Sequence, residues 1–170
     1  MKYVLDTNVF ITASRLYYSF DFGSKFWDFL LDNAENNKIV SIDKVYEEIK
    51  QGNDDLRNWA DEKFKKYFVN TQNENVLNTY AEIVGWVSTQ KSNVKEKYKY
   101  NEPAINEFMK ENNTDTWLIA FAKTYNYIIV TNESLNPYIK KKIPIPNVCK
   151  HFNIQYVNIF EMPKKLNFKI

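Results

Sequence analysis

Four short apolar runs, three of them without alternation of polar and apolar residues, most strongly constrain the fold of this 170-residue chain. A run without alternation is typical of a strand buried on both faces, as in a parallel sheet covered by helices. The runs are also rich in β-branched and aromatic residues, which favour strands. We therefore predict four strands, over residues 3–5, 39–42, 127–130 and 155–157.

Segments with apolar residues at helical spacing separate these strands. Alternation of strands and helices predicts an α/β fold, a three-layer α/β/α sandwich around a mainly parallel sheet of four or five strands. We predict a single domain over 1–170, with a helical insertion at about 70–112 that packs over one edge. The predicted helices are 7–14, 22–33, 43–51, 54–68, 75–89, 102–111, 114–125, 134–138 and 148–152.

The low counts of His, Cys and Gly exclude several kinds of site. Cys149 is the only cysteine, so the chain cannot form an internal disulfide or a zinc site of several thiolates. His151, the only histidine, lies two residues from Cys149. Residues at that spacing do not face each other on a helix, which argues against a catalytic Cys-His pair. The three glycines are scattered, so no glycine-rich phosphate loop is present. Carboxylates, amides, hydroxyls and lysines remain for chemistry, which favours a site for an oxygen-ligated metal.

Hydropathy and charge suggest the compartment and the kind of partner. No apolar run reaches the ~20 residues that span a membrane, and Asp6 interrupts the N-terminal apolar run too early for a signal peptide. We therefore expect a cytoplasmic protein without a membrane partner. The net charge of +2 is uneven, because residues 123–170 hold eight Lys and only two Glu. Such a basic segment fits either a phosphate-bearing partner or a solvated lysine-rich surface.

Acidic residues recur where ligands bind in open α/β sheets, beyond the carboxyl ends of the strands. Asp6 follows the first strand and Glu133 follows the third, while Glu47 and Glu48 lie on the helix after the second strand. Asp115 begins the helix that precedes the third strand. Converging carboxylates repel each other unless a cation neutralises them. Two divalent ions would balance the charge of four carboxylates and can together hydrolyse a phosphodiester.

Each of these acids also has a purely structural explanation. Asp6 and Asp115 stand where they can cap a helix or stabilise its first turn through the helix dipole. Glu133 can cap the short helix predicted after it. Glu47 and Glu48 are ordinary helix residues, and a surface Glu is usually only solvated. The metal hypothesis therefore depends on the set and its placement rather than on any single residue.

Four segments, in order along the chain, resemble the motifs of PIN-domain ribonucleases. The first is VLDTNVF, in which a strand ends in D-T-N; the second, SIDKVYEEI, is similar to S-x-x-V-x-x-E-L, with Ile in place of the final Leu. The third, DTWLIAFA, resembles D-x-x-L-I-A-x-A, and the last, IVTNE, resembles V-T-x-D, with Glu in place of Asp. These segments are residues 4–10, 41–49, 115–122 and 129–133.

The chain is also similar to a less characterised PIN-like subfamily of about this length. The insertion at about 70–112 is longer than in compact PIN toxins. The shared residues are Tyr17, Tyr18, Phe20, Phe26, Trp27, Asp54, Asp55, Leu56, Trp59 and residues 145–149.

The resemblance implies an endoribonuclease that depends on one or two Mg²⁺ or Mn²⁺ ions. Its motif register selects Glu48 over Glu47, so the implied metal ligands are Asp6, Glu48, Asp115 and Glu133. The family is often the toxin of a bacterial type II toxin–antitoxin pair, which implies RNA as substrate and a protein antitoxin of helix-turn-helix or peptidase-like type as partner. A homodimer is left open.

Further side chains are assigned to support the site and to hold the substrate. Asn8 and Thr131 are expected to orient carboxylates or water through hydrogen bonds. RNA bound at an acidic site needs positive charge at the rim, for which the Lys140, Lys141 and Lys142 run is the first candidate. The lysines at 91, 95, 97 and 99 are the second. The aromatic cluster formed by Tyr17, Tyr18, Phe20 and Phe22 fits the core, an antitoxin interface or base stacking.

Other functions remain open at this stage. The same fold serves nucleases that mature RNA or act on DNA, and a PIN fold can also be a non-catalytic module that binds RNA or a partner. The presence of all four acids argues against a non-catalytic module. A phosphatase with Asp6 as nucleophile usually needs D-x-D, and Asn8 occupies the second acidic position. Metal titration with a single-stranded RNA separates a nuclease from a binding module.

Overall fold

Five short parallel strands form the centre of the computed structural model, which describes residues 1–52, 54–91 and 95–168. Their order is β3-β2-β1-β4-β5, so the first strand of the chain lies in the middle of the sheet. All three residues of this central strand are fully buried, as their unbroken apolar run predicts. The strands are β1 (Tyr3–Leu5), β2 (Ile39–Ile42), β3 (Phe68–Val69), β4 (Ile128–Val130) and β5 (Tyr156–Val157).

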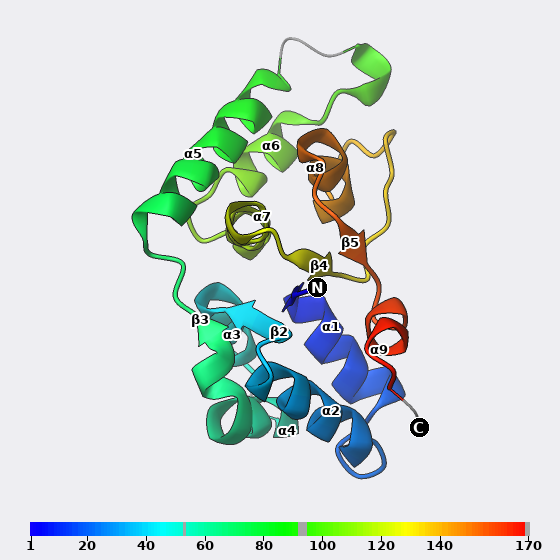
Figure 1. The fold of residues 1–170 in the computed structure, drawn as a ribbon. Helices are drawn as coiled ribbons and strands as arrows, with labels where there is room; N and C mark the ends of the chain where they lie inside the picture. The colour runs from blue at the N-terminus through cyan, green and yellow to red at the C-terminus, as the bar shows by residue number, and fades with distance from the viewer. Residues whose placement is uncertain (53, 92–94, 169–170) are drawn as a thin grey trace.

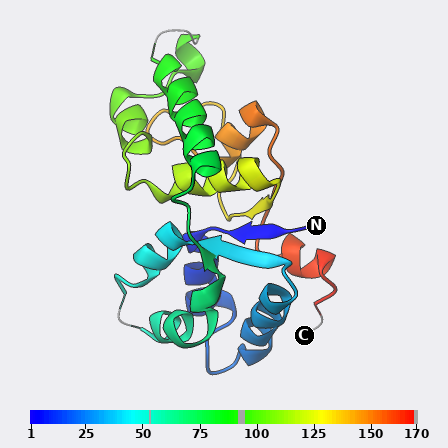
Figure 2. The same ribbon diagram turned by 60° about the vertical axis from the view of Figure 1, so that its left-hand side comes forward.

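Helices cover both faces of the sheet, which confirms the predicted three-layer α/β/α fold (Figures 1 and 2). One face carries α5 (Glu74–Thr89), α6 (Glu102–Phe108), α7 (Thr114–Tyr125) and α8 (Ile145–Phe152). The other face carries α1 (Thr7–Thr12), α2 (Ser24–Glu35), α4 (Asp55–Trp59) and α9 (Glu161–Lys165). The remaining α-helix is α3 (Asp43–Ile49), and short π- or 3₁₀-helical turns lie at η1 (Ala13–Tyr17), η2 (Ala60–Phe64), η3 (Lys65–Tyr67) and η4 (Glu96–Tyr98).

The described residues of the predicted insertion are helical and contain no strand. In this segment, α5 packs along α7, above the sheet in Figure 2. Tyr80 of α5 stacks on Trp117 of α7, with ring centroids 4.1 Å apart. Residues 92–94 of the insertion lie outside the described residues. Within the described part of the chain, no helix has both the length and the hydrophobicity needed to cross a membrane.

The predicted helix over 54–68 is wrong as one continuous element. It divides into α4, η2 and η3, and its last residue, Phe68, begins β3. Trp59 and Phe64 are five residues apart, which is the spacing of one π-helical turn. Their rings stack with centroids 5.1 Å apart, and both pack against Phe10. Packing of these rings in the core thus favours a π-helical turn over a continuous α-helix in this segment.

The predicted short helix over 134–138 is also wrong, because this segment is a loop. Pro137 disfavours helical dihedrals at Asn136. The Asn136 side chain accepts a hydrogen bond from the Tyr138 backbone N–H, and the Asn136 backbone carbonyl accepts one from the Asn147 side-chain amide. These bonds to side chains take the place of the helical hydrogen bonds.

Candidate functional site

The register of the two central strands brings Asp6 and Thr131 together. Leu5 pairs with Val130, so the next residue of each strand emerges at the same edge of the sheet. The Asp6 backbone N–H donates to the Val130 carbonyl at 3.0 Å, and Thr131 Oγ1 donates to Asp6 Oδ2 at 2.8 Å. Asp6 is only 3% exposed. Asp6 stands at the N-cap position of α1, as expected, but its side chain makes no capping hydrogen bond, so the alternative that its carboxylate only caps the helix is wrong.

Thr131 connects the ends of the two strands through its hydroxyl group. Besides donating to Asp6, Oγ1 accepts hydrogen bonds from Asn8 Nδ2 at 3.3 Å and from the Glu133 N–H at 3.2 Å. One donor and two acceptor positions are all that a hydroxyl offers, so the group is fully satisfied. Asn8 Oδ1 in turn accepts from the Asn132 N–H at 3.1 Å. Asn8 therefore reaches Asp6 only through Thr131.

Glu48, rather than Glu47, faces this edge of the sheet. The hydroxyl of Thr7, the residue after Asp6, donates a hydrogen bond to Glu48 Oε2. Glu47 points away and lies 3.9 Å from the ammonium of Lys44, with its side chain 59% exposed. Thr7 was not singled out from the sequence, although the D-T-N triplet at a strand end places its hydroxyl beside the site.

Asp115 lies in the first turn of α7 but does not cap the helix. Asn113 holds the capping position, and its Oδ1 accepts from the Thr116 N–H at 3.2 Å. A carboxylate in the first turn is favoured by the helix dipole. Burial and the nearby Glu133 carboxylate nevertheless raise the pKa of Asp115 to about 6, against the opposing effect of the Lys142 ammonium.

Glu133 is held by two partners from the segment that follows it. Its Oε1 forms an ion pair with the Lys142 ammonium, and its Oε2 accepts from the Ile145 N–H at 2.7 Å. Ile145 is the first residue of α8, so Glu133 satisfies the N-terminus of that helix. The prediction that it caps a helix immediately after it is therefore wrong.

The electrostatics of Asp6 reflect the convergence of these carboxylates. Its pKa is raised to about 8, first by burial and then by the negative charges of Asp115, Glu133 and Glu48. The hydrogen bond from Thr131 opposes this rise, because it stabilises the ionised form. Residues distant in sequence thus act on one buried carboxyl group.

The donor set fits a hard divalent cation. Carboxylate, hydroxyl and amide oxygens are the ligands that Mg²⁺ and Mn²⁺ prefer, and a cation would relieve the repulsion at Asp6. The side chains are not closed around a single point, since no three His, Cys, Asp or Glu residues in the described ranges are placed to share one ion. Glu133 is turned toward Lys142 and α8, and Glu48 toward Thr7. Joint coordination therefore requires side-chain rotation.

The three candidate rim lysines are all exposed but have different surroundings. Lys142 lies at the acidic site, where it pairs with Glu133. The Lys140 ammonium donates to the Glu96 carbonyl at 3.3 Å, and Lys141 lines a cavity together with Asp115 and Lys142. Lys142 is thus the one whose charge bears directly on the carboxylates.

The aromatic cluster that follows α1 divides between the core and the surface. Tyr18 stacks on Phe26, with ring centroids 4.1 Å apart, and Phe20 stacks on Trp27 at 4.3 Å. Tyr17 and Phe22 remain exposed. The prediction of a core role therefore holds for two of the four residues and is wrong for Tyr17 and Phe22.

Solved structures with the same fold match most of this chain. VapBC2 from Rickettsia felis bound to a DNA fragment from their promoter matches with a TM-score of 0.53 and 17% identity, over 93% of this chain and 98% of that chain. FitAcB from Neisseria gonorrhoeae matches with a TM-score of 0.53 and 15% identity, over 93% and 98%. FitAB bound to the IR36 DNA fragment matches with a TM-score of 0.53 and 12% identity, over 93% and 95%. At these identities the likeness establishes the fold, which is PIN-like.

Sequence comparison places the chain in a family. No curated protein sequence matched the chain. A family model described as "Domain of unknown function (DUF4411)" matches residues 3–170, which include every strand of the sheet and all four acidic residues of the site. The chain therefore belongs to the DUF4411 family, and its fold is PIN-like.

Proposed function

We propose that the protein is a metal-dependent endoribonuclease that cleaves RNA phosphodiesters at the edge of the sheet formed by the ends of β1 and β4. Asp6, Glu48 and Asp115 would hold a Mg²⁺ or Mn²⁺ ion, with Glu133 completing the site or binding a second ion. The observation that carries this proposal is the buried Asp6 carboxyl group, whose pKa three other carboxylates raise. Such an arrangement is costly to a fold unless a cation offsets it.

When bound, the ion would lower the pKa of a water molecule and neutralise charge that develops on the phosphate. The chain supplies fixed oxygen ligands for it. Thr131 holds Asp6 Oδ2, and Thr7 holds Glu48 Oε2, so one oxygen of each carboxylate is oriented and the other is available. Asp6 Oδ1 or Oδ2 must release its proton before a cation binds, because its pKa of about 8 keeps the carboxyl group neutral at pH 7. This makes the proposed activity rise with pH.

Lys142 links the carboxylates to the substrate in this proposal. Its side chain is 54% exposed and long, so the ammonium can leave Glu133 and meet a phosphate oxygen. Lys140 and Lys141 lie on the same loop as Lys142 and would extend the positive rim. Such a rim would strengthen RNA binding, because phosphate contacts dominate the affinity for nucleic acids.

A toxin of a bacterial toxin–antitoxin pair is the biological role that we propose, with a protein antitoxin as partner and the cytoplasm as location. The likeness to VapBC2 and FitAB, whose names denote two-component complexes, supports such a partner. The unpaired, fully buried Cys149 is compatible with a reducing compartment. If this role is right, expression of the protein stops growth only when Asp6 is intact.

Cleavage of a single-stranded RNA of mixed sequence tests the enzymatic proposal. The purified protein is incubated with the RNA, or with DNA of the same sequence, in Mg²⁺, in Mn²⁺ or in EDTA. We expect internal cleavage of RNA with either metal and none in EDTA. The Asp6→Asn variant is expected to lose this cleavage, because it loses a charged ligand of the ion.

Asp28→Asn is the matched control, since Asp28 is an exposed carboxylate on α2, away from the sheet edge. It is expected to cleave at the wild-type rate. Full activity of Asp6→Asn, or cleavage that persists in EDTA, would contradict the proposal. Cleavage of DNA but not RNA would keep the metal site and change the substrate.

A further inference from the structure

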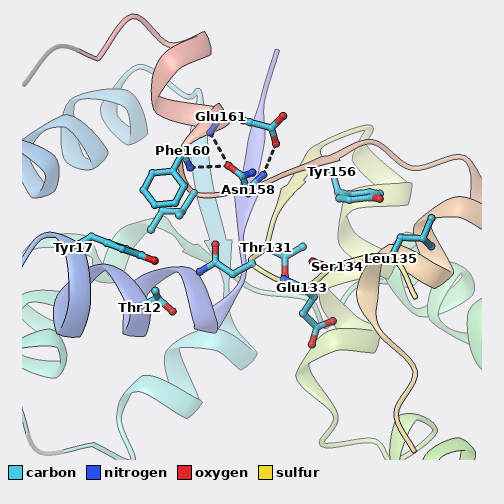
Figure 3. Close-up of a pocket in the computed structure, with 12 residues that line it drawn as sticks. Thr12, Tyr17, Thr131, Glu133, Ser134, Leu135, Tyr156, Asn158, Phe160 and Glu161 are labelled. Atoms are coloured by element: carbon cyan, nitrogen blue, oxygen red, sulfur yellow. Dashed lines mark hydrogen bonds between the residues drawn. The ribbon is translucent and has the colours of Figure 1, made fainter. Parts of the chain in front are cut away.

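A cavity of about 490 Å³ opens directly beside the acidic site (Figure 3). It is lined by Thr131 and Glu133 at the end of β4, by residues that follow β5, and by Tyr17 at the end of η1. The volume lies in the range of small-molecule sites. Because Glu133 belongs both to the cavity and to the acidic site, a group bound in the cavity would lie next to a ligand of the acidic site.

Three exposed aromatic rings border the cavity. Tyr17 is 50% exposed and Phe160 is 52% exposed, and their rings meet edge to face with centroids 5.0 Å apart. Tyr156, 36% exposed, lies across the cavity from this pair (Figure 3). Large aromatic side chains usually bury such surface, so rings that face a cavity offer stacking surfaces to a planar ligand.

Amide groups give the cavity a fixed polar edge. The Asn158 Oδ1 atom accepts from the backbone N–H groups of Phe160 and Glu161, each at 2.9 Å, which leaves its Nδ2 group as a free donor among the described residues. The Asn132 Nδ2 group is buried and has no hydrogen-bond partner in the described structure. The Asn158 amide is thus available to a ligand with acceptor atoms, and the Asn132 amide becomes a second donor once its side chain turns toward the cavity.

The charges around the cavity disfavour a phosphate as its occupant. Glu133 and Glu161 line it, and no Lys or Arg is among the described residues that do so. Two carboxylates repel an anion but accept hydrogen bonds from the amino groups of a neutral ring. Stacking surfaces combined with donors and acceptors match a nucleobase, and single-stranded RNA is recognised in this way.

We propose that this cavity binds one unpaired nucleobase of an RNA strand, the base of a nucleotide next to the phosphate that is cleaved at the acidic site. This inference rests on the proposed nuclease function for its substrate class. Tyr17, Tyr156 and Phe160 supply the stacking surfaces, and the amide of Asn158 contacts the base edge. The cavity is thereby a determinant of which RNA position is cleaved.

Binding of fluorescent single-stranded RNA, measured by anisotropy, tests the subsite. The buffer contains Ca²⁺, a cation that also prefers oxygen ligands. A set of oligonucleotides of one sequence carries a single abasic ribose at successive positions. Base stacking on an aromatic side chain contributes about 5- to 150-fold in affinity. We expect an affinity loss of this size at one abasic position and a smaller loss for Phe160→Ala with the intact oligonucleotide, because Phe160 is one of three rings that contact the base.

The two losses should not add, because an abasic nucleotide has no base for Phe160 to contact. Phe22→Ala is the matched control, since Phe22 is 94% exposed and does not line the cavity. It should bind like the wild type. Additive losses, equal affinity for all abasic positions, absence of RNA binding, or unchanged RNA affinity in Phe160→Ala would overturn the subsite. Unchanged RNA affinity in Phe160→Ala would instead assign the Tyr17 and Phe160 rings to contact with a protein partner.

Cleavage by the same samples in Mg²⁺ separates the two proposals. Base-dependent binding without cleavage would refute the nuclease function and leave the subsite in place. Cleavage by the wild type with base-independent binding would do the reverse. Thermal unfolding of Phe160→Ala confirms that an altered affinity does not come from misfolding.

Discussion

Replacement of Asp6 by Asn should stabilise the metal-free protein, although Asp6 is fully buried and hydrogen-bonded. Asn has the shape of Asp, and its Oδ1 can still accept the hydrogen bond from Thr131. The substitution removes a carboxyl group whose ionised form is opposed by burial and by Asp115, Glu133 and Glu48. The expected gain therefore depends on pH, and this dependence separates an electrostatic cause from a packing effect.

The magnitude follows from the pKa of Asp6, which is about 8 in the folded state against an ordinary value of 3.8. Between these values the folded state binds the proton more tightly than the unfolded state does. Stability is therefore fully present at low pH and falls as the pH rises from about 4 to about 8. For this carboxyl group the loss between pH 4 and pH 7 is about 4 kcal/mol, at 1.36 kcal/mol per pKa unit.

Urea unfolding in EDTA at pH 4 and pH 7 measures the effect. Asp6→Asn should gain about 4 kcal/mol at pH 7, equivalent to a melting temperature about 8–16 °C higher, and less than about 1 kcal/mol at pH 4. The Asp28→Asn control on the surface should stay within about 0.5 kcal/mol of the wild type at both pH values. A destabilised Asp6→Asn, or a gain that is the same at both pH values, would refute the electrostatic argument.

Three further outcomes follow from the same geometry. Thr131→Val should lower the free energy of unfolding by about 1–3 kcal/mol in urea titrations, because it removes one donor and two acceptor contacts. Thr131→Ser keeps these contacts and is the control. A Val variant as stable as the Ser variant would argue against the hydrogen-bond network around Thr131. Lys142→Ala should raise the pKa of Asp115 above about 6 in a carboxyl NMR titration, since the Lys142 ammonium lowers that pKa. Lys140→Ala should leave the pKa of Asp115 unchanged. A larger shift in Lys140→Ala than in Lys142→Ala would contradict the position of Lys142 at the acidic site. Cys149 should resist alkylation in the folded protein and react after unfolding, because burial raises the pKa of its thiol to about 12; rapid labelling of the folded protein would be inconsistent with its position.

The sheet and the position of its acidic edge could be predicted from the sequence because each depends on a local pattern. Unbroken apolar runs indicate strands buried on both faces, and parallel strands place their following residues at a common edge. The resemblance supplied the choice of Glu48 over Glu47, which the hydrogen bond from Thr7 supports. The strand β3 was missed because two residues, Phe68 and Val69, are too few to carry a pattern.

The partners of the acidic residues could not be predicted, because they depend on how distant segments pack. Glu133 satisfies the N-terminus of α8, twelve residues further along, only because the loop before that helix returns to the sheet edge. Lys142 approaches the carboxylates for the same reason. The cavity beside them forms because η1 packs against the turn before α9. The residues next to Tyr17 and Phe160 in the sequence give no indication of this contact.

Calorimetric titration of Mn²⁺ into the metal-free protein tests most directly whether the converging carboxylates form a divalent-cation site. Performed at pH 7 in two buffers of different ionisation enthalpy, it reports both binding and proton release. Saturable binding of one or two ions is expected, accompanied by release of the proton that Asp6 holds below its pKa of about 8. Asp6→Asn should weaken the binding and abolish the proton release, while Asp28→Asn should change neither. Absence of saturable binding, or identical binding and proton release by Asp6→Asn and the wild type, would contradict a metal site at this edge of the sheet.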